Sequence, residues 1–277
     1  MTSVDAALGA LGGSSLFVEA NGIRFHCRTD GPAGAPWIVF SNSLATNLAV
    51  WDQQVSELGS SFRILRYDQR GHGGTEVSRS PCTFDLLADD AARLLDAFDI
   101  DRATVIGVSM GAVTALRLAV GHPARLCRVV ACDGQWAAPS GAVATWEARI
   151  RTATEGGMAA LVESTVQRWF TPDFLAANPP VLDKVRRMIR ETPLAGFTSC
   201  ARALQDYDFR IPFSTIDVPT LLIVGGADGL LPQVMREMQR TIAGSAFVEI
   251  AQAGHLPNVE RPEAFNQALR SFLQGSR

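Results

Sequence analysis

The 277-residue sequence has no excess of basic residues: 25 Lys and Arg stand against 28 Asp and Glu, a formal net charge of −3 at pH 7. No run of Lys or Arg occurs either. A nucleic-acid-binding surface needs such residues to neutralise phosphates, so we expect no nucleic-acid partner. With 47% hydrophobic and 19% charged residues, the composition also excludes a disordered chain, a coiled coil and a collagen-like repeat.

Cysteine is scarce, and long hydrophobic runs are missing. The five cysteines are odd in number and include no C-x-x-C pair, which predicts reduced thiols in a cytoplasmic protein. The longest apolar runs, such as residues 221–224, are far shorter than the ~20 residues of a membrane span. Residues 1–15 carry no basic cluster, so we expect a flexible tail and no signal peptide. These features predict a soluble protein without membrane association.

Signatures of metal and phosphate binding are missing as well. The four histidines are scattered without the spacing of metal ligands. The glycine-containing stretch at residues 107–111 lacks the lysine of a phosphate-binding loop. We therefore expect no metal site and no cofactor.

What the sequence does contain is an alternation of short apolar runs with longer helical patterns. Six runs predict strands: residues 37–40, 63–67, 104–108, 128–132, 220–224 and 246–250. Three segments have helical spacing: residues 85–98, 112–120 and 262–273. Four of the strands are almost continuously apolar, which is typical of strands buried on both faces. The pattern therefore predicts an α/β fold with a mostly parallel, doubly wound sheet, preceded by a hairpin around Asn21-Gly22.

One region breaks this alternation. Between Gln135 and Pro212 the spacing predicts helices, at residues 146–151, 158–170 and 181–190, and no strand. We therefore expect a helical cap at residues 135–212. The cap would be inserted into an α/β core made of residues 16–134 and 213–277.

The strand at residues 104–108 runs into Gly107-Val108-Ser109-Met110-Gly111, followed by a helix. This G-x-S-x-G pattern between a strand and a helix is typical of a nucleophile elbow, where a sharp turn exposes a serine hydroxyl. The helix N-terminus favours the negative charge that develops there. Ser109 is therefore the candidate nucleophile.

A serine nucleophile needs a base, and the base needs an acid. His255 follows the last predicted strand, so it would lie at the carboxyl edge of the sheet with Ser109. Asp228 follows the strand at residues 220–224 and completes the chain order Ser, Asp, His. Asp206 and Asp208 lie in the cap, and Asp217 precedes its strand.

The other histidines suit structural roles. His26 on the hairpin is expected at the surface, His72 in a turn is expected to form a structural hydrogen bond, and His122 is expected at a helix C-terminus.

Attack on a carbonyl also needs two N–H donors for the oxyanion. Met110 at the helix start should supply one of them. The other should come from the loop after the strand at residues 37–40, where we favour Leu44, with Ser43 as the alternative.

These motifs resemble the α/β-hydrolase superfamily over nearly the whole chain, and within it the 3-oxoadipate enol-lactonase group. The resemblance is carried by five stretches: Ser41-Asn42-Ser43-Leu44, Trp51-Asp52, Tyr67-Asp68-Gln69-Arg70-Gly71-His72-Gly73, residues 107–111, and Arg168-Trp169-Phe170-Thr171-Pro172. The sequence departs from the group's pattern at three places. Ala45 replaces a glycine, Asp133 stands near where an arginine is usual, and the segment after Asp228 is more apolar. We expect a charged Asp133 to repel a dicarboxylate.

The resemblance implies a cofactor-free serine hydrolase that cleaves a small ester or lactone through an acyl-enzyme, with enol-lactones of aromatic catabolism as substrates. The cap is expected to provide apolar walls and a carboxylate-binding arginine. The candidate substrate-binding residues are Ser43, Trp136, Trp146, Arg149, Arg168, Trp169 and Phe170. Open alternatives are a broad carboxylesterase, a hydrolase of carbon–carbon or enamine-amide bonds in ring-fission products, and a ligand receptor without turnover. A monomer and a homo-oligomer are both compatible with the sequence.

Overall fold

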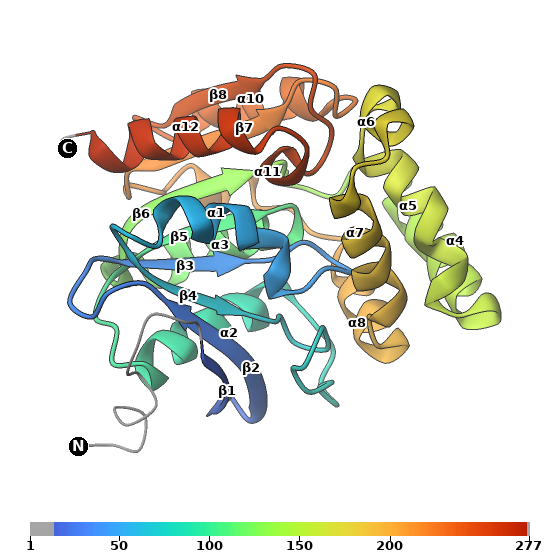
Figure 1. Ribbon diagram of the computed structural model, residues 1–277, viewed down its shortest axis with the longest axis horizontal. Helices are drawn as coiled ribbons and strands as arrows, with labels where there is room; N and C mark the ends of the chain where they lie inside the picture. Colours follow the sequence, from blue (N-terminus) through green and yellow to red (C-terminus); the bar gives the residue numbers. More distant parts are fainter. Residues whose placement is uncertain (1–13, 276–277) are drawn as a thin grey trace.

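The computed structural model describes residues 14–275, which form a sheet covered by helices (Figure 1). The eight strands lie in the order β1-β2-β4-β3-β5-β6-β7-β8. Their bounds are β1 Ser14–Ala20, β2 Ile23–Asp30, β3 Trp37–Ser41, β4 Arg63–Tyr67, β5 Ala103–Val108, β6 Leu126–Cys132, β7 Thr220–Gly225 and β8 Ala246–Ile250. β2 pairs antiparallel with β1 and β4, and every other pairing is parallel. The expected mostly parallel sheet and its opening hairpin are therefore confirmed.

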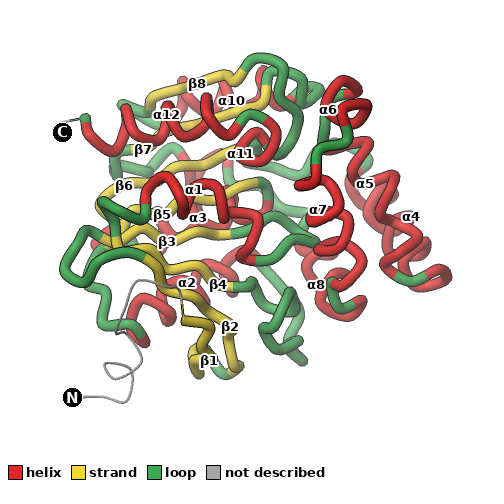
Figure 2. The backbone as a smooth tube through the Cα atoms, in the orientation of Figure 1, coloured by secondary structure: helices red, strands yellow, loops and turns green. Residues whose placement is uncertain are grey.

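Helices cover both faces of this sheet (Figure 2). The core helices are α1 Asp52–Leu58, α2 Phe84–Ala97, α3 Met110–Gly121, α10 Leu231–Thr241, α11 Pro257–Glu260 and α12 Pro262–Gln274. Short 3₁₀ turns occur at Leu48–Trp51 and Pro123–Arg125. In the view of Figure 1, α1 and α12 lie in front of the strands and α2 and α3 behind them. Every residue of β4, β5 and β7 is buried, which explains why these strands are so apolar.

The chain crosses from one side of β3 to the other between β4 and β5. β3 pairs with β4 on one side and with β5 on the other, and Ser41 at the end of β3 lies in register with Gly107 of β5. In open α/β sheets, ligands bind beyond the carboxyl ends of the strands at such a switch point. The site should therefore lie where β3 and β5 end.

The chain between β6 and β7 is helical. It contains α4 Ala142–Gly156, a 3₁₀ turn at Met158–Leu161, α5 Val162–Trp169, α6 Pro172–Ala177, α7 Pro180–Glu191, α8 Leu194–Ala203 and α9 Arg210–Phe213. Figure 1 shows α4 to α8 beyond the arrowheads of β3 and β6, over the carboxyl ends of the strands. A β-bridge between Ala137 and Asp208 joins the two ends of this segment. We refer to residues 135–212 as the cap.

The ends of the described chain affect one expectation. Most of the tail expected at residues 1–15 lies outside the described residues, but Ser14 and Ser15 already belong to β1.

The five cysteines are free thiols; all are buried except Cys127, which is half-buried. No helix between residues 14 and 275 has the length and apolar character to cross a bilayer.

Candidate active site

Ser109 lies at the turn between β5 and α3 with an unusual backbone conformation. Its φ is 57° and its ψ is −118°, a strained combination for a residue with a side chain. The neighbouring glycines make this turn possible. A Cβ at Gly107 would lie 2.0 Å from the carbonyl oxygen of Gly111, and a Cβ at Gly111 would lie 2.1 Å from that of Ser41. The tight packing lifts the Ser109 side chain above the sheet edge.

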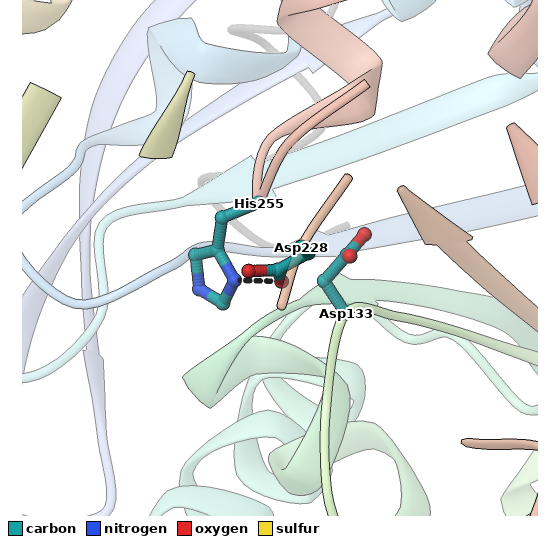
Figure 3. A group of neighbouring side chains, drawn as sticks. All are labelled: Asp133, Asp228 and His255. Atoms are coloured by element: carbon teal, nitrogen blue, oxygen red, sulfur yellow. Dashed lines mark hydrogen bonds and ion pairs between the residues drawn. The ribbon is translucent and has the colours of Figure 1, made fainter. Parts of the chain in front are cut away.

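Two other side chains reach this serine from distant parts of the sequence. The Oγ of Ser109 lies 2.8 Å from Nε2 of His255, in the loop between β8 and α11. Nδ1 of His255 lies 2.6 Å from Oδ2 of Asp228, in the turn after β7 (Figure 3). Burial opposes ionisation of Asp228, but the charge and hydrogen bond of His255 together lower the pKa of Asp228 below its usual value. The geometry is the one in which a histidine can take the serine proton.

The two residues expected to supply oxyanion donors lie close to Ser109. Met110 begins α3 and Leu44 follows β3, and both residues line the cavity above Ser109. Within the described part of the chain, neither N–H has a backbone or side-chain acceptor. The side-chain Oγ of Ser43, the alternative residue, also lines the cavity and is buried without a partner. This loop therefore offers donors to an incoming carbonyl oxygen.

The cavity has a volume of about 260 Å³ and lies between the carboxyl ends of the strands and the cap. Of the expected binding residues, Ser43, Trp146, Arg149, Arg168 and Trp169 line it. Trp136 and Phe170 lie outside this lining and pack against the hydrophobic core, so substrate binding by these two residues stays a prediction. Tyr207 lines the cavity and was not expected.

Arg149, which is half-buried, and Arg168, which is exposed, lie at the cap side of the cavity. Their guanidinium groups lie 5.4 and 5.7 Å from the ring centre of Trp146. Burial, with a smaller contribution from the charge of Arg168, lowers the pKa of Arg149 to about 10. Among the described residues, neither arginine forms an ion pair, and the buried Nε of Arg149 has no acceptor. An anionic group in the cavity would relieve this repulsion.

Asp133 directly follows β6. The sequence alone did not show whether its side chain faces the site. Its side chain is buried, accepts a hydrogen bond from the Gly225 N–H at 2.9 Å, and has an oxygen within 4.8 Å of an oxygen of Asp228. Burial, followed by the charge of Asp228, raises the pKa of Asp133 well above its usual value. The raised pKa favours the neutral carboxyl, which would weaken the repulsion of a dicarboxylate that the sequence led us to expect.

Among the described residues, one group of three acidic and histidine side chains is close enough together to bind a metal ion. Oxygen and nitrogen atoms of Asp133, Asp228 and His255 lie within 4.8 Å of one another. Both ring nitrogens of His255 are already engaged by Asp228 and Ser109. We therefore interpret the group as a hydrogen-bonded chain.

The remaining histidines lie away from the cavity. His26 is half-buried between Ser15 and Asp68 and bonds to both at 2.7 Å, so the surface position expected for it is only partly correct. His72 is buried and bonds to the Arg70 carbonyl, as expected. His122 ends α3, also as expected.

A matching family model, described as the alpha/beta hydrolase family, covers residues 34–268. The chain belongs to the alpha/beta hydrolase family. Two 3-oxoadipate enol-lactonases of Acinetobacter baylyi are 36% and 32% identical to this hydrolase, over 94% and 93% of its chain and 97% and 96% of theirs. The crystal structure of the enol-lactonase from Burkholderia xenovorans matches with a TM-score of 0.90 and 38% identity, covering 94% of this chain and 100% of that one. The resemblance seen in the motifs is confirmed, and these relatives support a hydrolase of the lactone or ester type with a small-molecule substrate.

Proposed function

We propose that this alpha/beta hydrolase is a serine hydrolase that needs no cofactor and cleaves a small lactone or ester through an acyl-enzyme. The observation that carries the proposal is the continuous chain from Ser109 through His255 to Asp228 at the floor of a cavity. A hydroxyl next to a neutral imidazole, with an ionised acid behind the ring, is the arrangement that makes serine nucleophilic.

The proposed reaction has two stages. Oγ of Ser109 attacks the substrate carbonyl as its proton passes to Nε2 of His255, and the oxyanion accepts hydrogen bonds from the N–H groups of Met110 and Leu44. The acyl C–O bond then breaks, and His255 returns the proton to the leaving oxygen. Water activated by His255 finally releases the acid and restores Ser109. With an enol-lactone, the leaving enol stays tethered to the acyl group and becomes a ketone.

The cap supports a substrate that carries a carboxylate besides the reacting carbonyl. Arg149 is half-buried and Arg168 is exposed, both line the cavity next to Trp146, and neither forms an ion pair with an acidic side chain of the described chain. A ligand carboxylate between them would form charge-assisted hydrogen bonds with both guanidinium groups. We therefore propose substrates similar to 3-oxoadipate enol-lactone, which fits the names of the relatives.

A substrate panel tests this proposal. Purified protein should hydrolyse 3-oxoadipate enol-lactone with a far higher kcat/KM than p-nitrophenyl acetate or butyrate. Equal rates on all three would indicate a broad carboxylesterase. Decay of a chromophoric vinylogous diketone, without lactone hydrolysis, would indicate cleavage of carbon–carbon bonds. A fluorophosphonate probe should label Ser109, and an unlabelled, inactive protein would instead be a ligand receptor.

A further inference from the structure

Behind the Ser109–His255–Asp228 chain lies a second carboxyl group, that of Asp133. In Figure 3, Asp228 lies between the imidazole of His255 and Asp133. The two carboxyl groups come from neighbouring strands, because Asp133 directly follows β6 and Asp228 lies three residues after the end of β7. β6 and β7 are paired, with Cys132 opposite Ile223. The pairing therefore holds the two aspartates side by side.

The surroundings of Asp133 fix its orientation. Its φ of 47° is rare for a residue with a side chain, and its own N–H donates to the Ile223 carbonyl at 3.0 Å. Oδ1 accepts from the Gly225 N–H, and Oδ2 lies 2.9 Å from Sγ of Cys132. Oδ2 accepts from the Cys132 thiol, and the oxygen of a carboxylic O–H can accept one hydrogen bond while it donates another, so Oδ2 can carry a proton.

Two adjacent carboxyl groups in a buried site do not both ionise, so one of them holds a proton. Asp228 faces the imidazole of His255 and the charge of Arg168 on α5, both of which favour its ionised form. Asp133 also lines the cavity, but the polar groups next to its carboxyl are the Asp228 carboxyl, the Cys132 thiol and the Gly225 N–H, none of which carries a positive charge. The proton therefore belongs on Asp133.

We propose that Asp133 is a positioning residue: it donates the O–H of a neutral carboxyl to Asp228 and so holds that carboxylate toward His255. The inference rests on the proposed serine mechanism. Asp228 would then receive one hydrogen bond from His255 and one from Asp133, and it could neither rotate away from the ring nor take up the imidazolium proton. The donor also weakens the negative charge that His255 experiences.

Two substitutions distinguish this role from two alternatives: that Asp133 is ionised, or that it only supports the local structure. Asp133→Asn keeps the shape, the acceptor for Gly225 and a donor toward Asp228. We expect it to retain the wild-type kcat and the wild-type acid limb of the kcat/KM–pH profile. Asp133→Ala removes the donor. We expect kcat to fall about 10- to 100-fold, as for loss of a hydrogen bond to a charged group, with KM little changed and the acid limb moved to higher pH.

An infrared difference measurement tests the proton itself and does not depend on turnover. At neutral pH the wild-type protein should show a carbonyl band of a protonated carboxylic acid that Asp133→Asn lacks. The matched control is Asp217→Asn, at an exposed aspartate, which should keep the band.

Three results would overturn the proposal. These are the absence of that band in the wild type, an acid limb that moves to lower pH in Asp133→Asn, and a wild-type kcat in Asp133→Ala. If Asp133→Ala does not fold, the band and the pH profile of Asp133→Asn decide the question. Failure of the serine mechanism is distinguishable, because Ser109 would then stay unlabelled by a fluorophosphonate whatever the infrared result.

Discussion

The backbone N–H of His255 donates a hydrogen bond to the carbonyl oxygen of Trp169 at 2.7 Å. Trp169 ends α5 in the cap, so the loop that carries the candidate base is fastened to the cap as well as to the sheet. Glu260 adds a second connection. Its buried carboxylate accepts from the Gly254 N–H at 2.7 Å and from the Thr171 N–H at 3.0 Å. The position of the imidazole therefore depends on both parts of the molecule.

Replacing Glu260 should weaken this connection. In Glu260→Gln one oxygen becomes an NH₂ group, and a buried N–H loses its charged acceptor. We expect the free energy of unfolding in urea to fall by about 1–3 kcal/mol, together with a lower kcat. Glu263→Gln on the exposed side of α12 is the control. Wild-type stability and kcat in Glu260→Gln would mean that the connection is not needed.

Ser109→Ala should remove activity without unfolding the protein. Loss of the nucleophile in comparable hydrolases lowers kcat by ~10⁶-fold, whereas a small side chain at a surface turn adds little to stability. Steady-state rates on p-nitrophenyl acetate and a thermal melt provide the measurement. Ser214→Ala, at an exposed serine of the cap–core junction, is the control. Retained turnover in Ser109→Ala would contradict the mechanism.

Arg149→Met should discriminate between substrates. The variant keeps an apolar stem against Trp146 but loses the charge, so a carboxylated lactone should bind about 10- to 100-fold more weakly. The KM of neutral p-nitrophenyl acetate should stay unchanged. Arg187→Met at an exposed position on α7 is the matched control. An equal effect on both substrates would argue against a carboxylate subsite.

Ala45 is a candidate for a stabilising substitution. Its φ is 60°, a region that costs a residue with a Cβ about 1–2 kcal/mol, whereas glycine enters it freely at the cost of about 0.5–1 kcal/mol of chain entropy. Ala45→Gly should therefore raise the free energy of unfolding by about 0.5–1 kcal/mol. Denaturant titration checks this. A clear loss of stability would show that the Ala45 methyl group makes contacts that outweigh the strain.

The raised pKa of Asp133, caused by its burial, predicts a pH-dependent stability. In the unfolded chain this carboxyl ionises near pH 4, whereas in the folded protein its burial moves the ionisation to a higher pH. Its contribution is therefore fully present below about pH 4 and is lost progressively as the pH rises toward the folded-state pKa. Asp133→Asn does not titrate, so its Tm relative to wild type should be higher at pH 7 than at pH 4. An equal Tm difference at both pH values would contradict this.

The sheet and the Ser109 turn were predictable because their patterns are local. A strand buried on both faces is apolar throughout, and the strained turn requires glycines at fixed spacing. α8 was missed for the opposite reason. Its sequence interrupts good helix formers with Gly196 and a Thr-Ser-Cys run, and its position depends on Gly196 packing against Gly71, where a Cβ would lie 1.8 Å from the Gly71 oxygen. Such a contact with a distant segment leaves no periodic pattern.

Part of the site was predictable because a residue that directly follows a parallel strand must lie at the carboxyl edge of the sheet. Ser109, Asp228 and His255 each follow a strand, so their meeting at one edge could be expected. The role of Asp133 depends on β6 lying next to β7 and on the side chain turning toward Asp228. Neither of these is visible in a single sequence. The sequence also does not show whether an aromatic residue of the cap, such as Trp136, packs in the core or lines the cavity, because an aromatic side chain suits both.

The bonds from His255 to Trp169 and from Glu260 to Thr171 limit how this enzyme can be re-engineered. A chimera that exchanges residues 135–212 for the cap of another hydrolase would also discard the carbonyl and the threonine that hold the histidine loop. The chimera would gain the substrate-binding residues of the donor cap, but the imidazole of His255 would no longer be held in position. Donor caps that keep an equivalent of the Trp169–Thr171 segment are the ones that should graft successfully.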